Sequence, residues 1–308
     1  MEIINSFHFF LSINQSIKMI YLSFIFCVLS LACSAFTNDR PIIGVLTQDC
    51  PFRKGAQYIA AGYVKWVEGG GARVVPLKYD MEGLEETLKY INGVLLPGGG
   101  ASFEGKYWDA LVTIFEHSVK SYEEGNSFPL WGTCLVFEEL ICVGARNASI
   151  LDGGYDSEDL ALPLKLESRA GMSRYFTDME ETMMKEMGLM NVRYNNHEMG
   201  ITPKTFSTHS VLGKLFDVLS TNTDRKGKPF ISMIEGHVYP MWGTQWHPEK
   251  VSFEWDNELA IPHSSSAIRI NMYPATFFVD QCRENKNKYP NKALEESSLI
   301  YNYKAEAT

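Results

Sequence analysis

Residues 129–140 read PLWGTCLVFEEL, and this stretch contains the joint that decides the fold. Its first five residues form a short apolar run that predicts a buried β-strand. Cys134 follows the strand at once, and an amphipathic segment then extends to about Val143. A strand that passes directly into a helix is the repeating unit of a parallel α/β sheet with helices on both faces. Sites in such sheets collect at the carboxyl ends of the strands, so the joint also predicts where chemistry occurs.

The same alternation of apolar runs and helical spacing continues on both sides of this joint. Towards the N-terminus it predicts strands at 41–46, 72–77 and 91–96 and helices at 57–69, 82–90 and 108–123. Towards the C-terminus it predicts strands near 191–201, 215–221, 230–235 and 241–246 and a last helix at 266–284, after a mixed stretch at 145–185. We therefore expect one α/β domain over residues 36–285, followed by a polar, loosely ordered tail over 286–308.

The composition of the 308-residue chain limits the classes of function. Its 28 Lys and Arg residues are outnumbered by 37 Asp and Glu residues, which gives a net charge of −9. This excess of acid argues against a nucleic-acid partner, which would need a basic surface. Six cysteines are too few for a disulfide scaffold, and no metal-ligand spacing is visible. We expect neither a metal nor an organic cofactor.

The N-terminal segment predicts a targeting signal rather than part of the folded domain. Residues 20–35 carry no charge, follow Lys18 and end in small residues, as the core of a signal peptide does. A membrane anchor is the alternative. A signal peptide at 1–35 implies the secretory pathway, with the lysosome, the vacuole or the extracellular space as destination. No later apolar run is long enough to span a membrane, and Asn147-Ala148-Ser149 is an N-glycosylation acceptor.

Two segments contain candidates for nucleophilic catalysis. Cys134 lies on the strand-to-helix turn, where the positive end of a helix dipole favours a thiolate. His247 in GTQWHPE (243–249) is the natural base, and Glu249 lies two residues on, on the same side of an extended segment. The alternative is that these residues have no catalytic role and are a small buried cysteine, a structural histidine and a solvated glutamate.

A third segment, Pro97-Gly98-Gly99-Gly100, ends the strand at 91–96. Its glycines allow close backbone approach, and the N–H groups of Gly98 and Gly99, together with that of Leu135, could form an oxyanion hole. An ordinary glycine turn is the alternative.

The ordered set PGGG, WGTC and GTQWHPE resembles the class I glutamine amidotransferase-like superfamily. The chain is more similar to one of its families, the gamma-glutamyl hydrolases that act on folate poly-gamma-glutamates. The resemblance covers about residues 40–285. The further segments that carry it are RPIIGVLTQDC at 40–50, YIAAGYVKWVE at 58–68, GARVVPL at 71–77, INGVLLPGG at 91–99, FEEL at 137–140, STNTD at 220–224 and TQWHPEK at 244–250.

The resemblance implies a flavodoxin-like three-layer α/β sandwich with a mostly parallel central sheet. It also implies Cys134 as nucleophile, His247 as base and acid, and Glu249 as its orienting partner. The substrate would be a small molecule, a pteroyl-poly-gamma-glutamate, cleaved through a gamma-glutamyl thioester. His197 matches a histidine that the family places in the substrate cleft. If protonated, it would bind a carboxylate and favour acidic working conditions.

The sequence departs from the family pattern at Val136, where the superfamily has a small residue two positions after the nucleophile. Its branched side chain is expected to crowd the turn and to slow turnover. The polyanionic substrate requires local cations, and the candidates by residue type alone are Arg53, Lys54, Arg169 and Arg193.

Two other functions stay open from the sequence, as does a homodimer. One is a glutaminase subunit that supplies ammonia to a synthase, which the leader argues against. The other is a non-catalytic binding protein on the same scaffold. If Cys134 is a working thiol, Cys50, Cys142 and Cys282 cannot all be paired within one chain.

Overall fold

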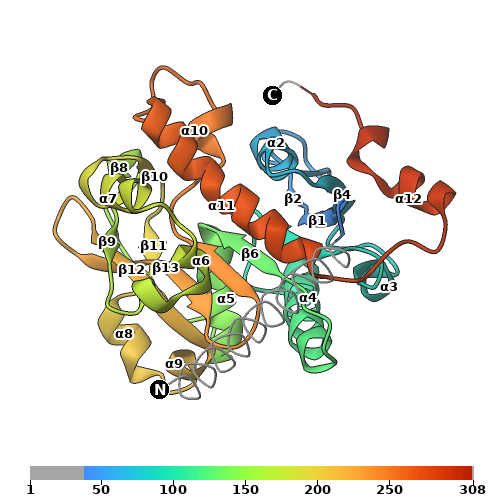
Figure 1. Ribbon diagram of the computed structural model, residues 1–308, viewed down its shortest axis with the longest axis horizontal. Coiled ribbons are helices and arrows are strands. Elements are labelled where there is room, and N and C mark those ends of the chain that lie inside the picture. Colours follow the sequence, from blue (N-terminus) through green and yellow to red (C-terminus); the bar gives the residue numbers. More distant parts are fainter. Residues whose placement is uncertain (1–37, 307–308) are drawn as a thin grey trace, which may run out of the picture. The chain divides into compact units, whose positions relative to one another are not determined.

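An eight-stranded sheet forms the centre of the protein (Figure 1), in the order β4-β1-β5-β6-β14-β13-β12-β9. The computed structural model describes residues 38–306, so the predicted signal peptide at 1–35 lies outside the described residues. The chain divides into the units Met1–Asp39 and Arg40–Thr308, and every helix and strand below belongs to the second.

Five neighbouring strands of the sheet run parallel: β4 (Arg73–Leu77), β1 (Ile42–Leu46), β5 (Gly93–Leu96), β6 (Leu130–Thr133) and β14 (Met241–Thr244). Antiparallel pairing then adds β13 (Pro229–Gly236), β12 (Phe216–Thr223) and β9 (Lys165–Leu166). Strands β1, β5, β6 and β14 are buried along their whole length, which explains why they read as continuous apolar runs. The prediction of a mostly parallel sheet is confirmed.

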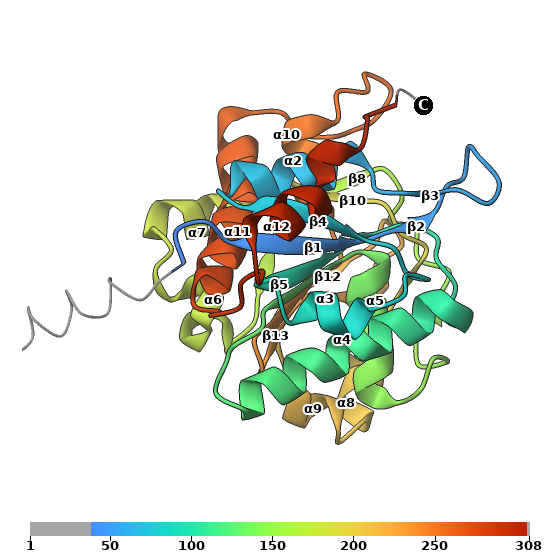
Figure 2. The ribbon, with the colours of Figure 1, turned by 90° about the vertical axis from the view of Figure 1, so that its right-hand side faces the viewer.

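Helices cover both faces of this sheet (Figure 2). A separate core of apolar side chains lies under each helical layer. One core contains side chains from α2 (Ala61–Gly69), α6 (Arg174–Thr177), α7 (Glu181–Leu189), α10 (Lys250–Phe253) and α11 (Ser265–Arg283). The other contains side chains from α3 (Leu84–Leu88), α4 (Gly105–Glu123), α5 (Leu135–Ala145), α8 (Pro203–Thr208) and α9 (Leu212–Leu215). The predicted three-layer sandwich is therefore confirmed.

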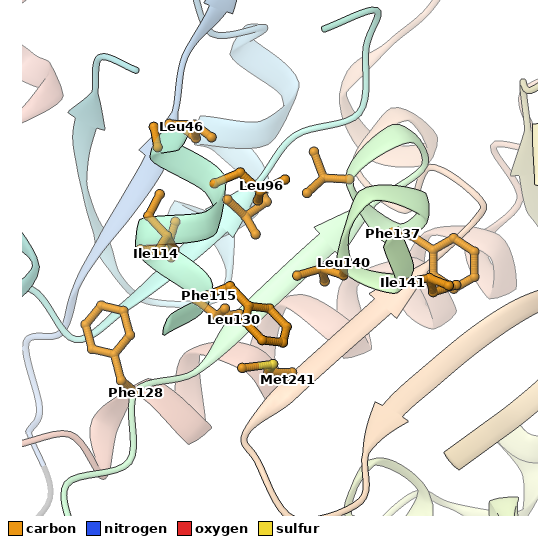
Figure 3. Close-up of a cluster of buried hydrophobic side chains, with 14 of the residues drawn as sticks. Leu46, Leu96, Ile114, Phe115, Phe128, Leu130, Phe137, Leu140, Ile141 and Met241 are labelled. Carbon is orange, nitrogen blue, oxygen red and sulfur yellow. The ribbon is translucent and has the colours of Figure 1, made fainter. Parts of the chain in front are cut away.

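The second core shows how the site-bearing helix is held against the sheet (Figure 3). Leu96 and Leu130 from two parallel strands meet Ile114 of α4 and Leu140 of α5. All four side chains are fully buried. Burial of each contributes about 1.5–3 kcal/mol, so α5 has a fixed position beneath the strand that precedes it.

Three short antiparallel pairs lie outside the main sheet: β2 (Gln48–Asp49) with β3 (Gln57–Tyr58), β7 (Asp152–Gly153) with β11 (Met199–Gly200), and β8 (Leu160–Leu162) with β10 (Arg193–Asn195). Two predictions are corrected here. The helix expected from residue 57 begins at Ala61, because Gln57 and Tyr58 pair with β2. The single strand expected near 191–201 is two strands, separated by a turn around His197.

The expectation of a loosely ordered tail from Asn285 is wrong. The tail forms α12 (Lys292–Ser298) and the 3₁₀ turn Ile300–Asn302, and it buries Tyr289 and Leu299 in the second core. Its asparagines explain the error, because polar composition concealed specific hydrogen bonds. Asn287 Nδ2 donates to the carbonyls of Leu88 and Ile91 at 3.1 and 3.0 Å.

The remaining short element is the 3₁₀ turn Ala170–Met172, which precedes α6. Among the helices of residues 38–306, none combines the length and the apolar character needed to cross a membrane.

Candidate active site

Three neighbouring parallel strands end at one edge of the sheet and bring the three predicted motifs together. Leu96 of β5 pairs with Gly132 of β6, and Thr133 of β6 pairs with Thr244 of β14. The segments that follow these strands begin with Pro97, Cys134 and Gln245. An added Cβ on Gly98 would lie 2.9 Å from both Cys134 Cβ and His247 Cε1. The motifs thus converge on Gly98.

Cys134 occupies a sharp turn between β6 and α5. Its backbone angles are φ 50° and ψ −108°, a region that non-glycine residues rarely adopt, and its N–H donates to Thr244 O at 2.8 Å. Such strain persists where the surroundings impose it, and it is concentrated at functional sites. The turn raises the sulfur at the N-terminus of α5, 3.8 Å from the carbonyl oxygen of Asn196.

Valine at position 136 does not prevent this turn. The close approach between strand and helix falls on Gly132, whose added Cβ would lie 2.7 Å from Leu140 Cδ1 and 3.0 Å from the Val136 carbonyl oxygen. The Val136 side chain is fully buried within the second core. The Val136 side chain therefore packs into the core and does not crowd the turn. The small residue that the turn requires is Gly132.

His247 and Glu249 form a buried pair. His247 Nδ1 lies 2.7 Å from Glu249 Oε1, and the His247 N–H donates to Tyr194 O at 2.8 Å. Burial disfavours the charged imidazole, but the Glu249 carboxylate and the hydrogen-bonded Cys134 side chain outweigh it and raise the pKa of His247 to about 10. With Nδ1–H directed to Glu249, Nε2 is the ring nitrogen left for proton transfer.

The predicted oxyanion donors are not equivalent. The Gly98 N–H donates to the Tyr63 hydroxyl at 2.8 Å, so it is committed elsewhere, and this corrects the prediction. Leu135 is the first residue of α5, where an N–H has no acceptor within the helix. Gly99 packs against Gln48, whose Oε1 an added Cβ would strike. Gly99 and Leu135 remain as candidate donors.

His197 differs from its expected charge state. Burial lowers its pKa to about 4, although the Met199 carbonyl, 2.7 Å from Nδ1, opposes that shift. A carbonyl only accepts, so Nδ1 carries the proton and Nε2 presents a lone pair. The ring lies edge-on to Phe230, with centroids 4.8 Å apart. Burial therefore favours a neutral ring, whereas the expected binding of a carboxylate would need a protonated one.

The four cationic candidates occupy separate places. Arg53 and Lys54 are exposed at the tip of the β2–β3 hairpin, where Arg53 pairs with Glu306. Arg169 pairs with Asp217 at 2.8 Å. Arg193 is buried, and its guanidinium lies 4.9 Å from the centre of the Trp246 ring.

Sequence reasoning missed several buried polar groups around the site. One is Tyr63, on the buried face of α2, whose hydroxyl lies 3.3 Å from His247 Nδ1. Glu138 accepts a hydrogen bond from Gln245 Nε2 at 2.8 Å. Burial raises the pKa of Glu138 to about 8, against the hydrogen bond from Gln245. The available signal was the pair of adjacent glutamates, Glu138 and Glu139, within an otherwise apolar helix.

The other predicted features lie away from this edge. Asn147 is exposed just after α5, and its Oδ1 accepts from Ser149 N at 2.9 Å. Cys142 and Cys282 are buried free thiols, and Cys50 is a half-buried free thiol. Within residues 38–306, no group of three or more His, Cys, Asp or Glu side chains is arranged to hold a metal ion.

Comparison with known proteins gives a consistent result. The family described as Peptidase C26 matches residues 41–249. The gamma-glutamyl hydrolase of Mus musculus is 41% identical over 274 residues, which cover 86% of this chain and 85% of that protein. The Homo sapiens gamma-glutamyl hydrolase is 38% identical, with coverage of 87% and 85%. Gamma-glutamyl hydrolase B of Dictyostelium discoideum is 38% identical, with coverage of 86% and 79%.

Proposed function

Because the chain belongs to the peptidase C26 family of gamma-glutamyl hydrolases, it is an enzyme that hydrolyses gamma-glutamyl bonds, and we propose that it does so through a thioester on Cys134. The substrate we propose is a pteroyl-poly-gamma-glutamate. The observation that carries the proposal is that Cys134 and the hydrogen-bonded pair His247–Glu249 converge beside Gly98. A nucleophile, a base and a group that orients the base are the parts that covalent acyl transfer needs.

In the first half of the reaction, the Cys134 sulfur attacks the carbonyl carbon of the gamma-glutamyl amide. Because its raised pKa keeps His247 protonated, Nε2 carries a proton from the start and the sulfur attacks as a thiolate. The C–N bond then breaks as Nε2 gives that proton to the leaving amine. The N–H groups of Gly99 and Leu135 hold the oxyanion of the tetrahedral intermediate. Glu249 keeps Nδ1 protonated throughout, so Nε2 alone exchanges protons.

In the second half, water attacks the thioester that remains. His247 Nε2 accepts a proton from that water and keeps it, while the sulfur departs as a thiolate. The products are a glutamate released at its gamma-carboxyl group and the regenerated Cys134 thiolate beside protonated His247. Atoms and charge balance without a cofactor in either half.

A neutral His197 can accept a hydrogen bond from the substrate at Nε2, whereas the expected protonated ring would donate one to a carboxylate. Its Nε2 is buried and has no hydrogen-bond partner within the described residues. A lone pair accepts an N–H and repels a carboxylate oxygen. We assign to His197 the binding of an amide N–H of the substrate, next to the turn whose Asn196 carbonyl faces Cys134.

The secretory route remains part of the proposal. The exposed Asn147, with Ser149 two residues on in a tight turn, is accessible for N-glycosylation. Delivery to a lysosome, to a vacuole or to the extracellular space would fit this feature and the signal peptide that the sequence predicts at 1–35.

The test is a pair of variants at the nucleophile, assayed by mass spectrometry of products from one defined pteroylpolyglutamate. Cys134→Ala removes the nucleophile and is expected to leave no turnover, whereas Cys134→Ser retains a weak one and is expected to accumulate an ester-linked acyl-enzyme. Free glutamine, run in parallel, is expected to be a poor substrate. Turnover by Cys134→Ala close to that of the wild type would rule out the proposed mechanism.

A further inference from the structure

Tyr63 connects two parts of the site that the proposed mechanism treats separately. It lies in the first turn of α2, is buried, and points its hydroxyl at the place where β5 ends. That hydroxyl accepts the Gly98 N–H at 2.8 Å and lies 3.3 Å from His247 Nδ1. One oxygen atom therefore contacts both the glycine segment and the histidine.

The direction of the hydroxyl proton follows from its neighbours. Burial, reinforced by the Glu249 carboxylate, raises the pKa of Tyr63 well above its usual value, so the phenol stays protonated. The His247 Nδ1–H is already directed to Glu249 and offers no lone pair. The Glu249 carboxylate, whose charge acts on both Tyr63 and His247, is the neighbouring acceptor toward which the Tyr63 proton can turn.

The peptide between Pro97 and Gly98 is held from two sides. Its N–H donates to Tyr63, and its carbonyl oxygen accepts from Gln48 Nε2 at 2.8 Å. Two hydrogen bonds at opposite ends of one planar unit fix its rotation. The orientation of this peptide determines where the next N–H, that of Gly99, points.

We propose that Tyr63 is a positioning residue that locks the Pro97–Gly98 peptide and the His247–Glu249 pair in one arrangement. In that arrangement the Gly99 N–H faces the carbonyl under attack while His247 Nε2 faces Cys134. This inference rests on the proposed function, because it assigns Tyr63 a role in the same acyl transfer.

The first experiment compares Tyr63→Phe with Tyr273→Phe. The control also removes one tyrosine hydroxyl bonded to a backbone group, since Tyr273 donates to Tyr175 O at 3.0 Å away from the site. Both variants keep the aromatic ring and its packing. We expect Tyr63→Phe to lower kcat about tenfold with KM within about twofold of wild type, since losing one positioning contact affects the transition state most. Tyr273→Phe is expected to keep wild-type kcat.

The pH profile separates positioning from simple stability. Without the Tyr63 hydroxyl, the full charge of Glu249 acts on His247, so the alkaline limb of kcat/KM is expected to move to higher pH. In a Glu249→Gln background, the loss caused by Tyr63→Phe is expected to shrink to about twofold, because the shared carboxylate is gone. Equal losses in both backgrounds, or a kcat for Tyr63→Phe that matches Tyr273→Phe, would overturn the inference.

A measurement on the wild-type protein covers the case in which Tyr63→Phe does not fold. A glutamyl aldehyde that adds to Cys134 is expected to shift the amide NMR signals of Gly99 and Leu135 and to leave that of Gly98 nearly unchanged. A dominant shift at Gly98 would overturn the role of Tyr63. Failure of the aldehyde to add to Cys134 would instead count against the proposed function, so the two failures are distinguishable.

Discussion

Replacing Glu138 with glutamine tests how the buried carboxyl beneath the active-site turn is charged. Burial raises the pKa of Glu138 from 4.5 to about 8, and its Oε1 accepts from Gln245 Nε2 at 2.8 Å. An acid whose pKa is higher in the folded chain binds more protons when folded. The free energy of unfolding therefore falls as the pH rises from the unfolded to the folded pKa.

The two pKa values set the magnitude. Between about pH 5 and pH 8, this one group lowers the free energy of unfolding by roughly 3–4 kcal/mol. Glutamine has the shape of the protonated acid and keeps an oxygen for Gln245, but it does not titrate. Glu138→Gln is therefore expected to match the wild type near pH 5 and to exceed its stability by about 3 kcal/mol near pH 8.

Urea unfolding at several pH values, followed by tryptophan fluorescence, measures this difference. Glu116→Gln, on the exposed face of α4, is the matched control and is expected to retain the wild-type pH dependence. If Glu138→Gln falls in stability between pH 5 and pH 8 as steeply as the wild type, Glu138 is ionised in the folded protein and the reasoning is refuted.

Three other predictions concern the site and the tail. Gly98→Ala adds a methyl group 2.9 Å from Cys134, His247 and Tyr63, so kcat should fall at least about 100-fold. The control is Gly100→Ala, whose added Cβ meets no atom within 4 Å and which should keep wild-type kcat in the same assay. His197→Asn should lower kcat/KM yet keep the shape of its pH profile between about pH 5 and pH 8, since the pKa of His197 is about 4; loss of an acid limb near pH 6 would show a protonated His197. Asn287→Ala removes donors to two buried carbonyls and should cost about 1–3 kcal/mol in urea unfolding; an unchanged midpoint would mean that the tail contributes no stability.

The parallel half of the fold could be predicted because local and global signals agree there. Strands β1, β5, β6 and β14 are short, apolar and fully buried. Such runs have no other place than the centre of a covered sheet. The relation between Cys134, His247 and Glu249 followed from the same logic, because parallel neighbours end at one edge.

The contacts that escaped prediction depend on the exact direction of single side chains. Tyr63 lies on the buried face of α2, and only its three-dimensional position reveals the hydrogen bond from Gly98. The neutral state of His197 depends on the Met199 carbonyl and on burial, neither of which a sequence pattern specifies. The order of the tail could not be predicted, because the sequence does not show that Asn287 donates hydrogen bonds to two backbone carbonyls.

The central claim is that His247 activates Cys134, and the rates at which iodoacetamide alkylates Cys134 and Cys50 test it most directly. Cys50 is the more exposed of the two, so exposure alone predicts that iodoacetamide labels it first. Activation by His247 predicts instead that Cys134 reacts first at mildly acidic pH and that His247→Asn slows its labelling at least about tenfold. Faster labelling of Cys50, or a Cys134 rate unchanged by His247→Asn, would contradict the account.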